Sequence, residues 1–123
     1  SLQVGDIITF ERTFTVEDVE LFTKVSGDSG AHHITPDEQG RLVIQGLLTA
    51  TLPTKIGGDH NVLARTVNFE FLRPVYSGDT ITCEVTIEKF EKKENRISIM
   101  SSFLCTNQNK KQVLSGSFAG VIL

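Results

Sequence analysis

A carboxylate and an imidazole lie five positions apart in the first third of the chain. Asp28 and His33 belong to the segment Ser26-Gly27-Asp28-Ser29-Gly30-Ala31-His32-His33, in which we expect neither regular helix nor strand. The two glycines permit turn conformations closed to other residues, so this loop can aim both side chains at one point. Such a pair can activate water by general acid-base chemistry. Each residue also has a structural interpretation, Asp28 as a turn-former and His33 as a structural or exposed histidine.

The elements before this segment would hold it in place. Residues 7–14 mix apolar residues with β-formers and predict a first strand. Thr15 then has the character of an N-cap, with Asp18 completing a capping box, so a helix is predicted over 16–26. Gly27 ends that helix, as glycine commonly does just beyond a helix C-terminus.

A second, buried helix is predicted after the loop. The stretch 42–52 is nearly all apolar or small, which is typical of an element buried on most sides. Pro53 lacks an N–H and requires that this helix kink or stop there. The glycine-rich segment 57–61 is then expected to form an exit turn, and a brief helical turn is expected earlier, over 36–40.

The second half of the chain predicts four strands joined by short polar connectors. We expect them over residues 62–72, 80–89, 96–106 and 112–121. A strand, helices and then an antiparallel run of strands is the pattern of α+β folds. A sheet curled around the central helix would bury it, and we expect one domain over residues 1–123.

Composition excludes several function classes. The net charge is −3, with basic and acidic residues mixed, so no nucleic-acid footprint is present. No apolar run is long enough to span a membrane, and no signal-peptide pattern is found, so no membrane partner is expected. Cys83 and Cys105 lack a metal-ligand pattern and fit reduced thiols in a cytoplasmic protein. The three histidines likewise show no ligand spacing, and no metal is expected.

An ordered set of short motifs resembles the MaoC-type, (R)-specific enoyl-CoA hydratases. The matching residues span nearly the whole chain in the family's order: Phe14-Thr15-Val16-Glu17-Asp18-Val19, Phe22, Ser26-Gly27-Asp28, His33, Gly46-Leu47-Leu48, Pro74-Val75 and Gly78-Asp79-Thr80. The resemblance implies a hotdog fold, in which an antiparallel sheet wraps around a central helix. It also implies an acyl-CoA thioester as substrate, no cofactor, and a homodimer or dimer of dimers.

The resemblance assigns roles to individual residues. Asp28 and His33 become a catalytic dyad for the reversible hydration of trans-2-enoyl-CoA to (R)-3-hydroxyacyl-CoA. Gly46, at a helix N-terminus, becomes the backbone N–H donor to the thioester carbonyl, although close helix packing would also explain a glycine there. Three further residues are expected to bind substrate: Gln45, Leu47 and Thr54. The Thr54 hydroxyl could instead serve the local backbone.

Three residues, at two places in the chain, depart from the family's pattern. Gly30-Ala31 stands where the family usually has Asn-Pro, and Gln45 stands where it has His. The first change loosens the loop, and the second replaces an imidazole with an amide. Weaker activity or a different acyl chain is therefore compatible with this sequence. Two other functions remain open on the same fold, an acyl-CoA thioesterase and a non-catalytic acyl-CoA binding module.

Overall fold

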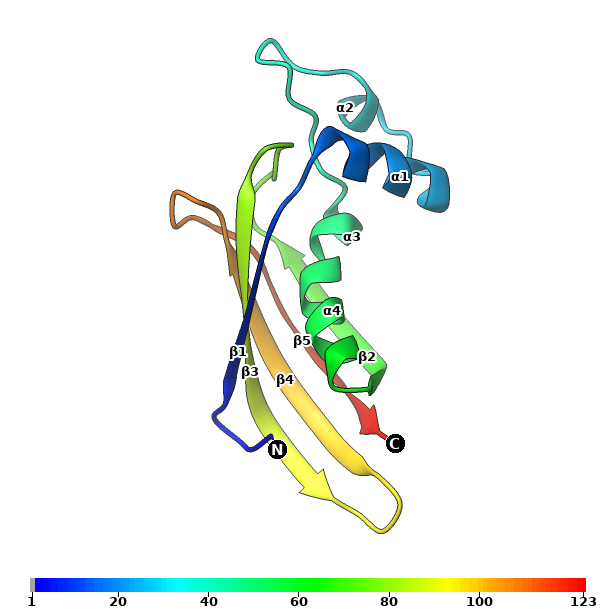
Figure 1. The fold of residues 1–123 in the computed structure, drawn as a ribbon, viewed down its shortest axis with the longest axis vertical. Helices are drawn as coiled ribbons and strands as arrows, with labels where there is room; N and C mark the ends of the chain where they lie inside the picture. Colours follow the sequence, from blue (N-terminus) through cyan, green and yellow to red (C-terminus); the bar gives the residue numbers. More distant parts are fainter. Residues whose placement is uncertain (1) are drawn as a thin grey trace.

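An antiparallel sheet of five strands curves around a central helix in the computed structural model, which describes residues 2–123 (Figure 1). The expected α+β architecture is therefore confirmed. The strands are β1 (Ile7–Thr13), β2 (Val62–Phe71), β3 (Thr80–Lys92), β4 (Ile97–Thr106) and β5 (Gln112–Ile122). The helices are α1 (Val16–Ser26), α2 (Ala31–Ile34), α3 (Gly46–Thr49) and α4 (Thr51–Asp59).

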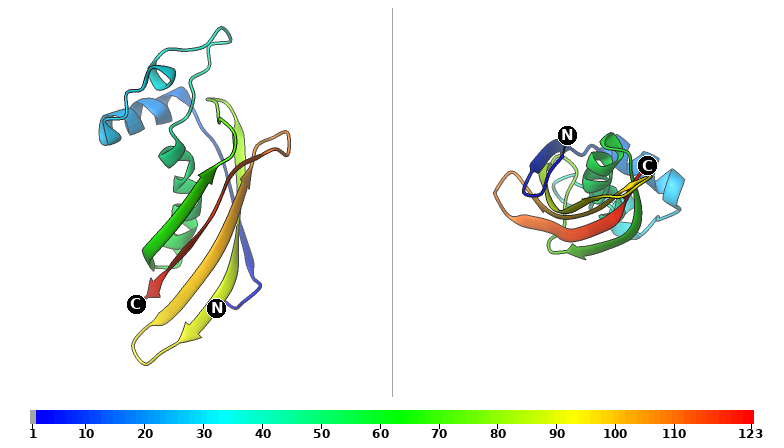
Figure 2. Two further views of the ribbon diagram at one scale, coloured as in Figure 1. Left: turned by 180° about the vertical axis from the view of Figure 1, so that it is seen from behind. Right: turned by 90° about the horizontal axis from the view of Figure 1, so that it is seen from below.

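The sheet order is β1-β3-β4-β5-β2, with every neighbouring pair antiparallel. The strands β3, β4 and β5 follow one another as hairpins, while β1 and β2 form the two edges. Seen from below, the sheet curls around the helix rather than lying flat (Figure 2). Each of the five strands lies close to its predicted range, because alternating burial along β3 and β4 matches the period-2 pattern of the sequence.

Helix α1 begins and ends where the sequence indicates. The Thr15 hydroxyl accepts a hydrogen bond from the Asp18 N–H, and the Thr15 N–H donates one to the Asp18 carboxylate, which completes the capping box. Gly27 closes the helix in the left-handed region, with φ 74°. Val19 is fully buried, while Val25 at the outer end is exposed. Asp28 therefore follows directly on a helix with two well-defined ends.

The central helix differs from the prediction at both ends. Residues 42–45 are extended rather than helical, because Val43 pairs with Tyr76 and the Ile44 N–H donates to the Val75 carbonyl at 2.7 Å. The helix begins at Gly46 instead and breaks at Ala50. The break places Pro53 in the first turn of α4, where a missing N–H leaves no hydrogen bond unmade.

Two glycines expected in the exit turn lie within α4. Gly57 and Gly58 are helical, and only His60 and Asn61 turn the chain into β2. A Cβ at Gly57 would make ordinary contacts with Val62 and Phe118, so this part of the helix lies close against β2 and β5. Packing therefore overrides the turn tendency of the glycine pair.

The loop between α1 and α3 also departs from expectation in two places. Residues Ala31–Ile34 form a short helical turn, so the segment around His33 is not entirely irregular. Residues 36–40 form a turn rather than a helix, because Asp37 accepts hydrogen bonds from the backbone N–H groups of Gln39 and Arg41. These contacts, led by the Arg41 N–H, hold the pKa of Asp37 below its usual value.

The core fills the space between the helix and the concave side of the sheet. Leu52 and Ile56 of α4 are buried with Val85 and Phe103 of the sheet, and Val19 of α1 belongs to the same cluster. This core fixes α4 against the sheet. In Figure 1, α1 and α2 lie at the upper end of the molecule, and α3 connects that end to α4.

Candidate active site

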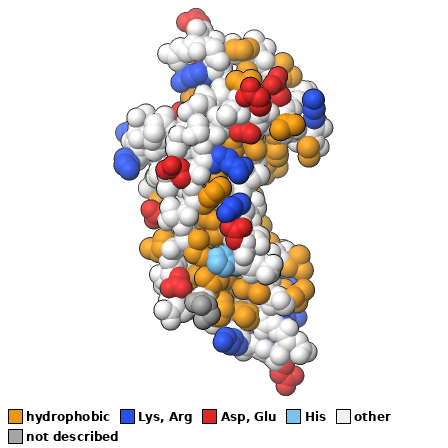
Figure 3. Space-filling model, viewed as in Figure 1, with side chains coloured by type: hydrophobic (Ala, Val, Ile, Leu, Met, Phe, Trp, Pro, Cys, Tyr) orange, Lys and Arg blue, Asp and Glu red, His pale blue; other side chains and the backbone are white. Residues whose placement is uncertain are grey.

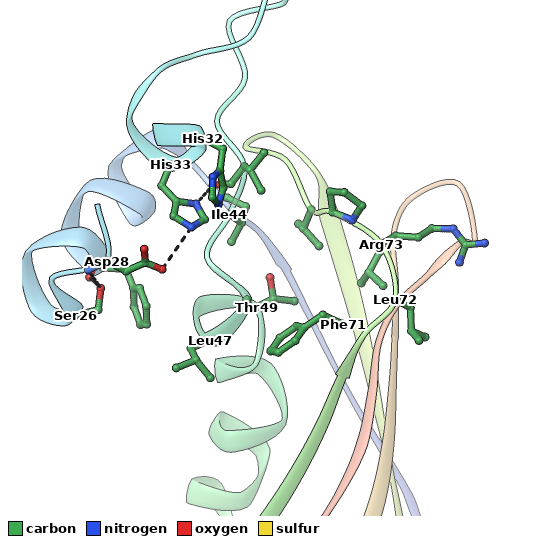
Figure 4. A pocket seen from close by; sticks show the side chains of 16 residues that line it. Ser26, Asp28, His32, His33, Ile44, Leu47, Thr49, Phe71, Leu72 and Arg73 are labelled. Carbon is green, nitrogen blue, oxygen red and sulfur yellow. Dashed lines mark hydrogen bonds and ion pairs between the residues drawn. The ribbon is translucent and has the colours of Figure 1, made fainter. Parts of the chain in front are cut away.

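A pocket of about 680 Å³ opens between α1, α2, α3 and the segment after β2 (Figure 4). Most of its walls are apolar side chains, and the polar side chains of Ser26, Asp28, His32 and His33 lie together at one side (Figure 4). The lining residues are Phe22, Ser26, Asp28, His32, His33, Val43, Ile44, Gly46, Leu47, Thr49, Phe71, Leu72, Arg73, Pro74, Val75 and Val113. An apolar cavity with a few convergent polar groups is the usual form of a small-molecule site.

Asp28 is held by the end of α1. Its N–H donates to Ser26 Oγ at 3.0 Å, and Ser26 Oγ donates in turn to the Phe22 carbonyl at 2.6 Å. The Asp28 carboxylate also accepts from the Gly30 N–H at 3.3 Å. The carboxylate is half exposed, at 51%, so it faces the pocket and its solvent.

His33 is held from the opposite side. Its side chain is only 6% exposed, and Nδ1 lies 2.6 Å from the Val43 carbonyl oxygen. A carbonyl can only accept, so Nδ1 carries the proton in the neutral ring and Nε2 carries the lone pair. The lone pair points to the pocket, because Nε2 lies 3.4 Å from Asp28 Oδ2. The two residues singled out by their spacing therefore meet.

Gly46 begins α3 across the pocket from this pair. A Cβ at this position would lie 2.7 Å from the Phe71 ring, so the glycine is required for the close approach of that ring. No hydrogen bond uses the Gly46 N–H among residues 2–123, as expected for the first residue of a helix. Close packing against Phe71 thus explains the glycine, and its backbone N–H has no partner among the described residues.

The other three residues expected to bind substrate have three different surroundings in the structure. Leu47 lines the pocket and is 59% exposed. The Gln45 side chain is buried and turns to α1, where Nε2 donates to Thr23 Oγ1 at 2.9 Å. Thr54 lies outside this pocket, along a smaller cavity next to β2, and its hydroxyl donates to the Thr51 carbonyl. Only Leu47 of these three contributes a side chain to the pocket wall.

Several lining residues have no distinct signal in the sequence. Thr49 is buried in the wall, and Phe71 closes the side over Gly46. Arg73 lies at the rim and donates to the Gln112 carbonyl. A single threonine or arginine is too common to indicate a site. The position of Phe71 at a strand end is compatible with either the core or a tunnel wall, and alternation does not distinguish the two.

The histidines do not gather into a metal centre. The His32 ring lies against the His33 ring, with centroids 3.9 Å apart, while His60 follows the far end of α4. Among residues 2–123, no group of three or more His, Cys, Asp and Glu side chains is placed to hold a metal ion.

Comparison with known proteins defines the class. The (R)-hydratase of A. caviae involved in PHA biosynthesis is 23% identical and superposes with a TM-score of 0.86, covering 100% of this chain and 98% of that one. An R-hydratase of Pseudomonas aeruginosa is 22% identical with a TM-score of 0.85, covering 98% of this chain and 81% of that one. This chain therefore has the hotdog fold.

The family follows from the sequence match. Residues 31–115 match the model of the FAS1-like, dehydratase domain region, and the chain belongs to this family. A mitochondrial 3-hydroxyacyl-(acyl-carrier-protein) dehydratase of Arabidopsis thaliana is 27% identical over 98% of this chain and 78% of its own length. The chain is thus a member of the dehydratase and hydratase class of hydro-lyases. No helix of residues 2–123 has the length and apolar character to cross a membrane.

Proposed function

We propose that the protein adds water to trans-2-enoyl thioesters and forms (R)-3-hydroxyacyl thioesters, reversibly, with Asp28 and His33 as the catalytic dyad. The observation that carries this function is the 3.4 Å approach of Asp28 Oδ2 to His33 Nε2 on the wall of a pocket of about 680 Å³. Two proton-accepting atoms that face one point can hold a single water between them.

Each group has a defined task in the hydration. The water gives up a proton to the dyad as its oxygen forms a bond to Cβ of the enoyl group. The π electrons of the double bond move toward the thioester carbonyl, and a proton then passes from the dyad to Cα. General acid-base help of this kind contributes roughly 10²- to 10⁴-fold to a rate.

The negative charge that develops on the thioester oxygen needs a fixed donor. Gly46 supplies its free N–H at the start of α3, opposite the dyad. Donors of this type are each worth about 3 kcal/mol in a transition state. The apolar walls formed by Phe22, Leu47 and Phe71 suit the acyl chain, since burial of its methylene groups is favourable.

The carrier of the acyl group defines two versions of the proposal. We expect coenzyme A, on the resemblance to enoyl-CoA hydratases. The name of the Arabidopsis relative favours acyl carrier protein as a second candidate. Both carriers present the same enoyl thioester to the dyad, so the chemistry at Asp28 and His33 is common to them.

The test is a hydration assay with trans-2-enoyl-CoA substrates of several chain lengths. Loss of the absorbance of the conjugated thioester, with chiral analysis of the product, is expected to show (R)-3-hydroxyacyl-CoA. Asp28→Asn and His33→Ala should each lower kcat by at least about 10²-fold, because each removes a proton acceptor of the dyad. Enoyl groups carried by acyl carrier protein, assayed in parallel, distinguish the two carriers.

The chain offers matched controls for both variants. Asp59→Asn removes an exposed carboxylate paired with Lys55, and His60→Ala removes a histidine at the far end of α4. Both should keep the wild-type rate. A near-normal rate in either dyad variant would contradict the assignment. Free thiol release without hydration would indicate a thioesterase, and ligand-induced stabilisation without turnover would indicate a binding module.

The proposed enzyme is a homodimer or a dimer of dimers. Strand β2 is an edge of the sheet, and it exposes Leu63, Val67 and Phe71. An edge strand with apolar side chains is a template for pairing with another chain. A second copy is the occupant we expect, and Phe71 would bring that contact to the rim of the pocket.

A further inference from the structure

Gln45 joins the helix that precedes the dyad to the helix that begins at Gly46. Its side chain is 1% exposed, and Nε2 donates to Thr23 Oγ1 at 2.9 Å and to the Val19 carbonyl at 3.4 Å. Both acceptors belong to α1, whereas Gln45 directly precedes the first residue of α3. Among residues 2–123, no other hydrogen bond joins α1 to the segment Gln45–Thr49.

The acceptor on α1 stands one turn before Asp28. The Thr23 carbonyl accepts the Gly27 N–H at 2.9 Å and closes the last turn of α1. The Asp28 N–H then donates to Ser26 Oγ within the same turn. Thr23 and the backbone of Asp28 therefore belong to one hydrogen-bonded turn at the end of α1.

One atom of the Gln45 amide has no hydrogen-bond partner among the described residues. This atom is Oε1, and it is buried. A buried polar atom without a partner is unfavourable, and an apolar side chain of similar size would avoid that cost. The hydrogen bonds from Nε2 to α1 therefore explain the amide, and the stability of the core does not.

We propose that Gln45 is a positioning residue, which sets the distance between the Asp28–His33 pair and the Gly46 N–H. This role rests on the proposed function, in which water is activated at the pair while the thioester oxygen is held at Gly46. The separation must match the span from Cβ to the carbonyl oxygen of the substrate. A misplacement of about 1 Å in such an arrangement can cost 10²-fold in rate.

The first test is the variant Gln45→Met, which keeps length and apolar volume and removes the amide. We expect kcat to fall by about 10- to 100-fold with KM changed by less than about 2-fold, since the side chain does not contact substrate. Thr23→Val removes the same hydrogen bond from α1 and should have the same effect. Thr23→Ser keeps the hydroxyl and should restore the wild-type kcat.

The double variant Gln45→Met/Thr23→Val tests whether both changes act through one link. It should be no slower than Gln45→Met alone, because that change already removes the hydrogen bonds to both Thr23 and Val19. Ile56→Val is the stability control, since it trims a buried side chain of α4 away from the pocket wall. It should lower the Tm and leave kcat unchanged.

The outcomes separate this inference from the proposed function. If Asp28→Asn is inactive while folded Gln45→Met and Thr23→Val retain kcat within about 2-fold, the dyad stands and the positioning role is wrong. If the wild-type protein hydrates no enoyl thioester, the proposed function fails. In that case the ring ¹⁵N resonances of His33 test, without an activity assay, whether Gln45 holds the dyad in place. They should shift in Gln45→Met and not in Thr23→Ser, and unchanged resonances in Gln45→Met would overturn it.

Discussion

Single residues in this site serve packing and chemistry at once. Gly46 is the clearest case, because the Phe71 ring occupies the space that a Cβ would need, while the N–H of the same residue stays free. The two roles can be separated, since an alanine at this position keeps the N–H and disturbs only the packing.

Gly46→Ala is expected to destabilise the protein by about 1–3 kcal/mol, the usual cost of overpacking, and to lower kcat as the start of α3 moves. The double variant Gly46→Ala/Phe71→Val should regain most of the lost stability and rate. Urea denaturation and the hydration assay measure the two effects. Recovery of stability without recovery of rate would show that the Phe71 ring itself contributes to the reaction.

The sequence predicts which residues lie near the pocket better than it predicts whether their side chains point into the pocket. The proximity of Asp28 and His33 follows from their spacing, because Gly27 ends α1 directly before Asp28 and only four residues separate the two. Gln45 and Thr54 were expected at the substrate, but one turns to α1 and the other to its own helix. Sequence adjacency to Gly46 gives no information on which face of the helix a side chain occupies.

At the scale of elements, local signals predicted α1 and the strands well. The capping box of α1 lies within four residues, and hairpin strands contact their sequence neighbours. The family resemblance places Gly46 at a helix N-terminus, whereas the apolar pattern of residues 42–52 starts the helix too early. The pattern fails there because the extended conformation of Val43 depends on Tyr76, which is distant in the sequence. Non-local contacts of this kind have no counterpart in the periodicity of a single segment.

The pairing of β3 with β4 leads to a prediction about the two thiols. Cys83 and Cys105 lie directly opposite each other, both free and fully buried. A hydrogen bond with Cys105, followed by burial, raises the pKa of the Cys83 thiol above its ordinary value of 9.0. We therefore expect neither cysteine to react with a maleimide in the folded protein at neutral pH, and both to react after unfolding in urea.

The same pKa direction sets a dependence of stability on pH. The folded protein keeps the Cys83 proton at a pH where the unfolded chain loses it. The resulting contribution to stability is complete below pH 9.0 and is lost as the pH rises beyond that value. Thermal unfolding across this range should show a declining Tm, and Cys83→Ala should flatten the decline. An equal decline in this variant would assign the effect to other groups.

At the scale of the whole molecule, the apolar surface is the feature that the monomer does not explain. Hydrophobic side chains reach the surface along much of the face shown in Figure 3, between scattered charges. The exposed residues of β2 belong to an edge strand that pairs on one side only, with β5. Folding alone leaves this edge open.

We expect sedimentation velocity to give a mass twice or four times the 13.6 kDa of the chain. Val67→Lys places a charge on the exposed edge of β2 and should shift the protein to the monomer. Val4→Lys, at an exposed position before β1, should leave the mass unchanged. A wild-type protein that sediments as a monomer at every concentration would contradict the proposed assembly.

The order of elements along the chain also governs how this molecule is made. Asp28, His33 and Gly46, the residues of the proposed catalytic centre, all precede the three hairpin strands β3, β4 and β5. During synthesis the apolar central helix therefore leaves the ribosome before the sheet that buries it exists. Exposed apolar surface of that kind invites aggregation and chaperone binding. The strands β3, β4 and β5, which carry none of the residues of the proposed dyad, thus complete the core that buries this helix.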